Sequence, residues 1–357
     1  MPKNICFIGA GLRGGGQERA LTAMANYFAK LGCEVFIINL FKTEQFFELE
    51  KSIRVIWPKT DRTKKHRLVY ALQLIPYVRK NIKEIKPDVL LSYGEWFNPF
   101  VILVTRFLNV PLFVLERMGP QISLGFIVGT GRELLYRYAT GVMVQTAIAA
   151  DLIKKKTRAR NIGIIPNPLN VINTKTDFKK RRIVSVGRLS REKGHDVLLR
   201  AFASLPNQDW SLHIVGDGPE KPSLEGQTQK LGVSDRVVFH GHLKNFSHIL
   251  GESEIFILPS YYEGFPNALL EAMSVPLACI SSNCVAGPSD IIEHGKNGLL
   301  VEPGNVYELA RAIEFMISDI ELRKKLASEA YKVREKYRFD KIAQQYLDFI
   351  TKSINTS

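Results

Sequence analysis

Residues 4–16 read Asn4-Ile-Cys-Phe-Ile-Gly-Ala-Gly-Leu-Arg-Gly-Gly-Gly16, a short apolar run that opens directly into a glycine-rich loop. Apolar residues then recur at helical spacing over 17–31, and Gly32 ends this helix before a second apolar run at 34–40. The order of strand, loop, helix and strand predicts the start of a doubly wound α/β domain built on a parallel sheet.

The same pattern restarts in the second half of the chain, with a strand at 183–186, a loop at 187–194, a helix at 195–204 and a strand at 212–215. We therefore expect two Rossmann-like domains, 1–170 and 171–338, with a polar linker at 169–180 between their patterned regions. A last helix at about 339–357 is expected to pack back on the first domain. Open α/β sheets bind ligands beyond the carboxyl ends of their strands, so the two domains are expected to share their ligands across a cleft.

Further strands are predicted at 89–92, 112–115, 141–145, 162–165, 237–239, 255–258 and 277–280. Helices are predicted at 68–85, 97–108, 132–138, 151–156 and 268–273, with helical sequence from 306 to about 352. Pro76 lies inside the first of these helices and predicts a kink or a split there.

The 357-residue chain is 45% hydrophobic and 24% charged, which excludes disorder, collagen and coiled coil as its overall class. Its four cysteines show no C-x-x-C spacing and no neighbouring histidine pair, so the sequence predicts no zinc site and a reducing compartment. We expect no signal peptide, because the apolar run at 5–10 is too short. We also expect no transmembrane helix, because polar residues and prolines interrupt the most apolar stretch, 96–116.

The net charge of +14 is unevenly distributed along the chain. Residues 1–170 hold 25 Lys and Arg against 12 Asp and Glu, a balance of +13, whereas residues 171–357 hold 24 against 23. Such an excess points to a membrane surface, a phosphorylated ligand or nucleic acid, although a solvated face would also carry it. Nucleic acid is disfavoured, because no nucleic-acid-binding motif accompanies the charge.

The glycine loop formally matches the dinucleotide fingerprint at Gly9, Gly11 and Gly14. The fingerprint also requires an acidic residue near the end of the second strand, and residues 37–42 contain none. We therefore favour a loop in which Gly14, Gly15 and Gly16 bring backbone N–H groups close to a phosphate or a sugar. A glycine turn without a ligand is the alternative.

Two stretches of the second half carry groups suited to a nucleotide sugar. Arg188 and Lys193, five residues apart on one loop, can converge on a diphosphate, unless the loop is simply exposed and basic. Farther along, Glu263 precedes a helix that starts near Pro266, and Glu271 lies about one turn inside it. Both carboxylates can accept hydrogen bonds from sugar hydroxyls. The alternative is a capping carboxylate and a surface one.

These motifs together resemble glycosyltransferase family 4, whose members are retaining enzymes with the GT-B fold. The resemblance rests on Glu263-x7-Glu271, Arg188 with Lys193, the glycine loop followed by Glu18-Arg19, and the stretches 166–168, 287–295 and 297–301. It is dense over 183–305 and scattered in the first half.

The resemblance implies a role for each matching residue. Arg188 and Lys193 would neutralise the donor diphosphate, Glu271 would bind the ribose and Glu263 would lie near the donor sugar. The remaining donor-binding positions would be Gly14, Gly15, Gly16, Gly264, Phe265, Pro266 and Asn267. The family needs no metal or other cofactor and is thought to use no covalent nucleophile, so the two cations would stabilise the leaving group. The second domain would bind the nucleotide sugar and the first the acceptor.

One position departs from the family pattern. Many relatives carry a Glu-His pair after a first-domain strand, whereas this chain has Glu116-Arg117 there. Some relatives that build polysaccharides on lipid carriers resemble it in this respect, so both residues are candidate catalytic residues with open roles. A strand-end ion pair is the alternative.

The acceptor is expected to be a glycan linked to a lipid diphosphate, with a UDP-linked hexose or N-acetylhexosamine as donor. A basic run at 61–67, the apolar stretch 68–78 and four further basic residues up to Lys86 predict peripheral attachment to anionic lipid at the cytoplasmic face of the plasma membrane. A solvated helix would also explain them. A sugar-nucleotide epimerase and a non-catalytic nucleotide- or lipid-binding protein remain as alternative functions.

Overall fold

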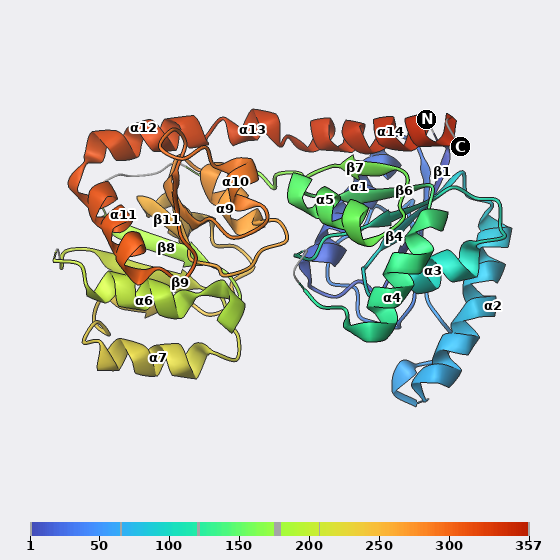
Figure 1. Ribbon diagram of the computed structural model, residues 1–357, viewed down its shortest axis with the longest axis horizontal. Coiled ribbons are helices and arrows are strands. Elements are labelled where there is room, and N and C mark those ends of the chain that lie inside the picture. Colours follow the sequence, from blue (N-terminus) through green and yellow to red (C-terminus); the bar gives the residue numbers. More distant parts are fainter. Residues whose placement is uncertain (1, 65, 120–121, 175–179, 207, 356–357) are drawn as a thin grey trace. The chain divides into compact units, whose positions relative to one another are not determined.

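The computed structural model describes all residues except 1, 65, 120–121, 175–179, 207 and 356–357. The chain divides into two compact units (Figure 1): unit 1 comprises residues 1–167 and 342–357, and unit 2 comprises 168–341. The boundary between the units therefore falls at Asn167–Pro168. Part of the expected linker, 175–179, lies outside the described residues.

Unit 1 is built on a seven-stranded sheet with the order β3-β2-β1-β4-β5-β6-β7, and all of its neighbouring strands are parallel. The strands are β1 (Asn4–Gly9), β2 (Glu34–Asn39), β3 (Arg54–Ile56), β4 (Val89–Tyr93), β5 (Leu112–Leu115), β6 (Gly141–Val144) and β7 (Ile162–Ile164). The central strands β4, β5 and β6 are buried throughout, as expected for a parallel sheet covered on both faces.

The helices of unit 1 are α1 (Gly16–Lys30), α2 (Arg67–Ile85), α3 (Asn98–Thr105), α4 (Gly125–Leu135) and α5 (Ala147–Lys156), with 3₁₀ turns η1 (Arg62–Lys64) and η2 (Tyr136–Tyr138). The helix expected at 132–138 begins at Gly125 instead. Glycines 125, 129 and 131 lower the helix propensity of this segment, which is why the sequence pattern missed its start.

Helix α2 contradicts the predicted split, because it continues through Pro76 as one helix of 19 residues. Its buried residues Tyr70, Leu74, Val78 and Ile82 recur at helical spacing and pack in the core of unit 1. Burial of four large side chains outweighs the roughly 3 kcal/mol cost of an interior proline.

The terminal helix α14 (Phe339–Asn355) belongs to unit 1 from Ile342 onward. The Phe349 ring lies 5.8 Å from the ring of Phe113 and fills the space above two strand glycines, Gly141 and Gly163. A Cβ atom at either glycine would come within 2.9 Å of the Phe349 ring. The Ser353 hydroxyl accepts a 2.5 Å hydrogen bond from Asn161 in the same unit.

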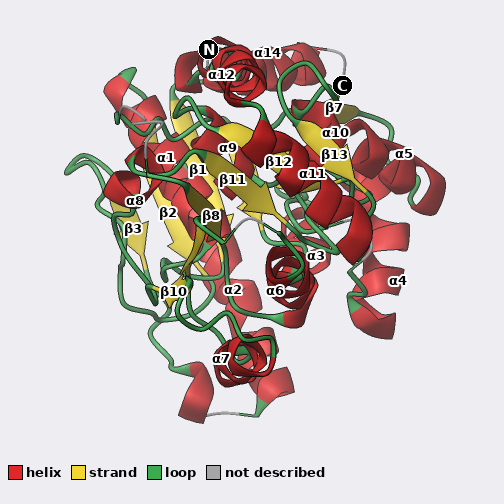
Figure 2. Ribbon diagram, turned by 90° about the vertical axis from the view of Figure 1, so that its left-hand side faces the viewer, coloured by secondary structure: helices red, strands yellow, loops and turns green. Residues whose placement is uncertain are grey.

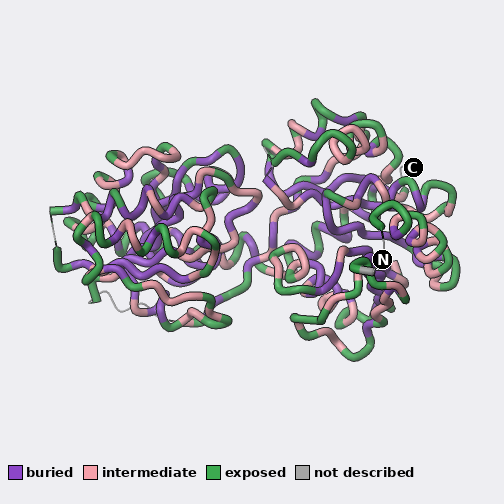
Figure 3. Tube along the Cα trace, turned by 90° about the horizontal axis from the view of Figure 1, so that it is seen from below, coloured by how far each residue is buried: buried purple, intermediate pink, exposed green. Residues whose placement is uncertain are grey.

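Unit 2 repeats the architecture with a six-stranded parallel sheet in the order β10-β9-β8-β11-β12-β13. Its strands are β8 (Arg182–Val186), β9 (Ser211–Val215), β10 (Val237–Phe239), β11 (Ile255–Leu258), β12 (Ala278–Ser282) and β13 (Leu299–Val301). Figure 2 shows the strands in yellow, and Figure 3 shows the buried residues of the chain in purple. The predicted fold class, two doubly wound α/β domains with parallel sheets, is confirmed.

The helices of unit 2 are α6 (His195–Ala203), α7 (Lys221–Lys230), α8 (Ser247–Gly251), α9 (Asn267–Met273), α10 (Pro288–Ile291), α11 (Val306–Ser318), α12 (Ile320–Ala330) and α13 (Val333–Lys336), with the 3₁₀ turn η3 (Arg191–Lys193). All four cysteines are buried free thiols. Among the described residues, no helix has the length and apolar character needed to cross a membrane.

Candidate functional site

The two candidate diphosphate ligands lie on the loop that joins β8 to α6 in unit 2. Lys193 ends the 3₁₀ turn η3, and its Nζ lies 2.7 Å from Oε1 of Glu263. Arg188 is exposed, and the described residues include no hydrogen-bond or ion-pair partner for its guanidinium. The structure therefore brings Lys193 and Glu263 together and leaves Arg188 open to solvent.

Glu263 is held by two partners at once. Its side chain is only 7% exposed, and Oε1 also accepts a 2.7 Å hydrogen bond from the Ser260 hydroxyl. Ser260 follows β11, the strand next to β8 in the sheet, so the two loops meet at the carboxyl edge. Sequence reasoning missed Ser260, because a lone serine three residues before a glutamate carries no recognisable signal.

A close backbone approach fixes this pairing. Gly194 has a φ of +64°, and a Cβ atom there would lie 2.1 Å from the carbonyl oxygen of Pro259. The Tyr261 N–H donates a 2.8 Å hydrogen bond to the Glu192 carbonyl beside it. Only glycine permits this contact, which places Lys193 against the loop that carries Glu263.

Glu271 lies inside α9, as the sequence predicts, and is 6% exposed. The segment before it, from Gly264 to Asn267, leads into the helix with Pro266 as the N-cap residue. The Phe265 side chain is buried in the core of unit 2 and packs near the Tyr337 ring at 6.1 Å. Phe265 can therefore offer a ligand only its backbone groups.

The glycine loop of unit 1 connects β1 to α1, with Gly15 as the N-cap residue of the helix. Gly14 and Gly16 are exposed, and a Cβ atom at Gly16 would meet nothing within 4 Å. A Cβ atom at Gly14 would press on the Phe46 ring at 3.1 Å, and one at Gly15 would lie 2.3 Å from the Glu18 carboxylate. Packing against Phe46 thus explains Gly14, whereas the Glu18 carboxylate beside Gly15 ends a flexible side chain that can move, and Gly16 leaves its backbone open.

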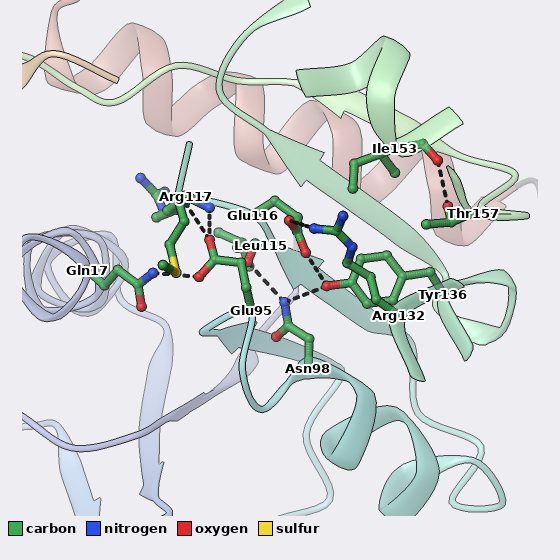
Figure 4. Close-up of polar contacts among 11 residues, drawn as sticks. Gln17, Glu95, Asn98, Leu115, Glu116, Arg117, Arg132, Tyr136, Ile153 and Thr157 are labelled. Atoms are coloured by element: carbon green, nitrogen blue, oxygen red, sulfur yellow. Dashed lines mark hydrogen bonds and ion pairs between the residues drawn. The ribbon is translucent and has the colours of Figure 1, made fainter. Parts of the chain in front are cut away.

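Glu116 and Arg117 follow β5 and point into different networks (Figure 4). The Glu116 carboxylate pairs with Arg132 Nη1 at 3.2 Å and accepts a hydrogen bond from the Tyr136 hydroxyl. Burial raises the pKa of Glu116 from 4.5 to about 7, and repulsion from Glu95 adds to the effect. Glu116 therefore forms a strand-end ion pair, and its partner is Arg132 rather than the neighbouring Arg117.

Arg117 is partly buried among the polar groups of unit 1. Its guanidinium donates hydrogen bonds to Asn167 Oδ1 and to the Tyr346 hydroxyl of α14, and it lies 5.1 Å from the centre of the Tyr93 ring. These contacts link the end of β5 to the terminal helix. They give Arg117 a structural role in addition to any contact with a ligand.

Sequence reasoning missed Glu95, which organises this part of unit 1 (Figure 4). Glu95 is 1% exposed, and its carboxylate accepts hydrogen bonds from the backbone N–H groups of Arg117 and Met118. Its other oxygen accepts a 2.6 Å hydrogen bond from the Gln17 amide of α1. Glu95 therefore fixes the turn after β5 relative to the helix that follows the glycine loop.

A pocket of about 410 Å³ opens beside the glycine loop of unit 1. Its charged lining residues are Arg13, Glu18, Lys42, Asp61 and Arg62, and Phe41 supplies an aromatic wall. The Thr43 hydroxyl accepts a 3.0 Å hydrogen bond from the Leu12 N–H, which joins the loop after β2 to the glycine loop. The mixed charge and single aromatic face suit a polar ligand with hydroxyl and anionic groups.

Two family models match the chain, "Glycosyltransferase Family 4" over residues 14–171 and "Glycosyl transferases group 1" over residues 171–333. An uncharacterized glycosyltransferase of Haemophilus influenzae is 28% identical over 93% of this chain and 95% of its own length. The Campylobacter jejuni GalNAc-alpha-(1->4)-GalNAc-alpha-(1->3)-diNAcBac-PP-undecaprenol alpha-1,4-N-acetyl-D-galactosaminyltransferase is also 28% identical, over 98% of this chain and 99% of its own length.

Among solved structures, HepE from Anabaena in complex with UDP is similar in fold, with a TM-score of 0.80 and 20% identity. The similarity covers 98% of this chain and 100% of that chain. The two family models together account for both units of the structure. The chain is thus a glycosyltransferase with the GT-B fold and belongs to glycosyltransferase family 4.

Proposed function

We propose that the chain is a retaining glycosyltransferase that moves a hexose or an N-acetylhexosamine from a UDP-linked donor to a glycan on a lipid diphosphate. The observation that carries the proposal is the contact between Lys193 and Glu263 at the carboxyl edge of the unit 2 sheet, on the loop that also carries the exposed Arg188. Parallel sheets bind ligands at this edge, and two cations there suit a diphosphate.

In this proposal the bond between the anomeric carbon and the β-phosphate oxygen breaks as the acceptor hydroxyl attacks from the same face. The proton of that hydroxyl passes to the leaving phosphate oxygen, so the products are UDP and the extended glycan. Arg188 and Lys193 stabilise the charge that develops on the diphosphate, and Glu263 orients Lys193 and contacts the donor sugar. Glu271 binds the ribose hydroxyls, and no side chain acts as a covalent nucleophile.

The glycine loop and the acceptor complete the proposed site. Gly16 offers its backbone N–H to the donor, while the Gly15 N–H donates a 2.9 Å hydrogen bond to the Arg13 carbonyl and shapes the loop. The pocket beside the loop receives the acceptor glycan. The proposed reaction needs no metal.

Two relatives support the donor and the acceptor. HepE from Anabaena was solved with UDP, and the name of the Campylobacter jejuni relative specifies a glycan on a PP-undecaprenol carrier. The charge of +13 on residues 1–170 supports peripheral attachment to an anionic membrane at the cytoplasmic face.

The experiment that tests the proposal is a donor panel. Purified protein is incubated with UDP-, GDP- and dTDP-linked sugars, with and without a lipid-diphosphate acceptor, and released nucleotide and products are measured. We expect UDP release that depends on the acceptor and an α-linked product from an α-linked donor. A donor whose sugar changes configuration without any acceptor would identify an epimerase instead, and an inverted product would exclude the retaining mechanism.

A further inference from the structure

Helix α4 of unit 1 packs against the core through Leu135 at its end, but it exposes the apolar side chains of its first turn. None of its eleven residues is buried, although a helix on a globular domain ordinarily buries one apolar face. Phe126 and Ile127, in its first turn, are 87% and 86% exposed. Two large adjacent apolar side chains this far in solvent need a function or a partner.

The first turns of α2 present a similar surface. Leu68 and Leu72 are 68% and 66% exposed and lie one helical turn apart, so they share the outward face of the helix. The opposite face is buried through Tyr70 and Leu74. Leu68, Leu72, Phe126 and Ile127 are together called the apolar edge below.

The topology places both helix starts on the same side of unit 1. Helix α2 follows β3 and α4 follows β5, and each returns antiparallel to the sheet before the next parallel strand. Their first turns therefore lie at the carboxyl edge of the sheet, toward the lower side of unit 1 in Figure 1. The glycine loop and the turn that carries Glu116 and Arg117 lie at this same edge.

The charge around the apolar edge identifies its partner. Four Lys and Arg residues, Arg62, Lys64, Lys65 and Arg67, precede Leu68 in the sequence, against one acidic residue, Asp61. Arg62 and Arg67, next to Leu68, are exposed. The first turns of α2 and α4 contain no acidic side chain either, and helix N-termini carry partial positive charge. Exposed apolar side chains on the same edge as these cations match the boundary between anionic headgroups and acyl chains.

We propose that the apolar edge enters an anionic bilayer, with Phe126 and Ile127 as its deepest side chains. The inference rests on the proposed function, since it places the membrane at the edge of unit 1 to which a lipid-linked acceptor must come. It adds to the electrostatic attachment a specific pair of inserting side chains on α4. The acceptor diphosphate, at the membrane surface, would then lie at the same depth as the exposed Arg62 and Arg67.

Vesicle co-sedimentation with matched variants tests the inference. The full chain is mixed with vesicles of phosphatidylglycerol and phosphatidylcholine, or of phosphatidylcholine alone, at low and high salt. We expect the wild-type protein to prefer the anionic vesicles and to bind them less at high salt. Phe126→Ser with Ile127→Ser should lower the partition coefficient by about tenfold or more, since either side chain contributes about that factor when buried. The control, Leu103→Ser with Phe107→Ser, removes exposed apolar side chains near the C-terminal end of α3 and should bind as the wild-type protein does.

A fluorescent probe reports insertion directly. Because the four native cysteines are buried, Ile127→Cys and Phe107→Cys can each be labelled selectively with an environment-sensitive dye. The dye at position 127 should shift to shorter wavelength with anionic vesicles, whereas the dye at position 107 should not.

The inference fails if the emission of the dye at position 127 does not shift, or if the Phe126/Ile127 variant binds anionic vesicles as well as the wild-type protein. It also fails if the Leu103/Phe107 control loses as much vesicle binding as the variant, or if a changed oligomeric state of the variant explains its weaker binding. UDP binding by calorimetry separates this inference from the proposed function. Intact UDP binding with membrane binding that ignores α4 defeats the inference alone, whereas absent UDP binding in a protein that still inserts α4 defeats the proposed function.

Discussion

The ammonium group of Lys193 lies 2.7 Å from the carboxylate of Glu263, and the two residues come from loops that follow neighbouring strands of the unit 2 sheet. The pair is mostly removed from solvent, so each charge depends on the other. A donor diphosphate would offer Lys193 a second anionic partner. The pair therefore serves both the stability of the loop and the proposed chemistry.

Because only Lys193 is paired with Glu263, variants of Lys193 and Arg188 should differ in stability but not in their loss of activity. Lys193→Ala and Arg188→Ala should each lower kcat/KM by roughly 2–4 kcal/mol of transition-state stabilisation, because each removes a donor to the developing charge. Only Lys193→Ala should also lower the free energy of unfolding, by about 1–3 kcal/mol, because it leaves the Glu263 carboxylate without its cation. Arg191→Ala, an exposed arginine of the same loop, is the control. The assignment fails if either variant keeps the wild-type kcat/KM.

Glu271 is expected to act through nucleotide affinity. Glu271→Gln keeps the shape of a buried side chain but removes the charge that strengthens its hydrogen bonds to ribose hydroxyls. We expect UDP to bind roughly tenfold more weakly in calorimetry, equivalent to about 1.4 kcal/mol. Glu302→Gln, at an exposed glutamate of the same unit, should bind UDP normally. Equal affinity of the Glu271 variant and the wild-type protein would remove the ribose role.

Metal removal tests the proposal that Arg188 and Lys193, rather than a metal ion, stabilise the leaving diphosphate. If Arg188 and Lys193 carry the leaving-group charge, sugar transfer should continue at its full rate in excess EDTA. A metal-dependent glycosyltransferase assayed in the same buffer shows that the chelator works. Loss of activity that Mg²⁺ or Mn²⁺ restores would contradict the proposal.

Glu116 predicts a pH dependence of stability with a definite sign. Its pKa rises from 4.5 to about 7 on folding, so the folded state binds the proton more tightly than the unfolded state. The stability contributed by this proton is present below pH 4.5 and is lost as the pH rises through about 7, by up to about 3 kcal/mol. Glu116→Gln has no proton to lose, so its unfolding free energy should gain on that of the wild-type protein between pH 5 and pH 8.

Urea unfolding at both pH values measures this difference. Glu133→Gln, at an exposed position of α4, should follow the wild-type pH profile. Parallel profiles for Glu116→Gln and the wild-type protein would show that the carboxyl group titrates normally.

The sequence predicted both sheets, because each strand and each glycine loop is marked by residues that are close together in the sequence. It did not predict the start of α4, where three glycines weaken the helical pattern and burial adds no signal. Nor could it predict Glu95, which binds the N–H groups of residues 117 and 118, more than twenty positions later. The partner of Glu116 was unpredictable for the same reason, because Arg132 follows it only after an intervening loop and most of α4.

Arg117 provides the last prediction, because its position supports two roles with different consequences. Its guanidinium binds Asn167 and the Tyr346 hydroxyl, which ties α14 to the end of β5. Hydrogen bonds to a charged group contribute about 1.5–3 kcal/mol each, so Arg117→Met should cost about 3 kcal/mol of stability and Tyr346→Phe about half of that. Both variants should speed amide hydrogen exchange in residues 342–355, because each frees the terminal helix from the sheet. Arg137→Met, at an exposed arginine of unit 1, should leave this exchange unchanged. If Arg117→Met abolished sugar transfer while residues 342–355 kept their protection, Arg117 would act on the substrate and its contacts with α14 would be secondary.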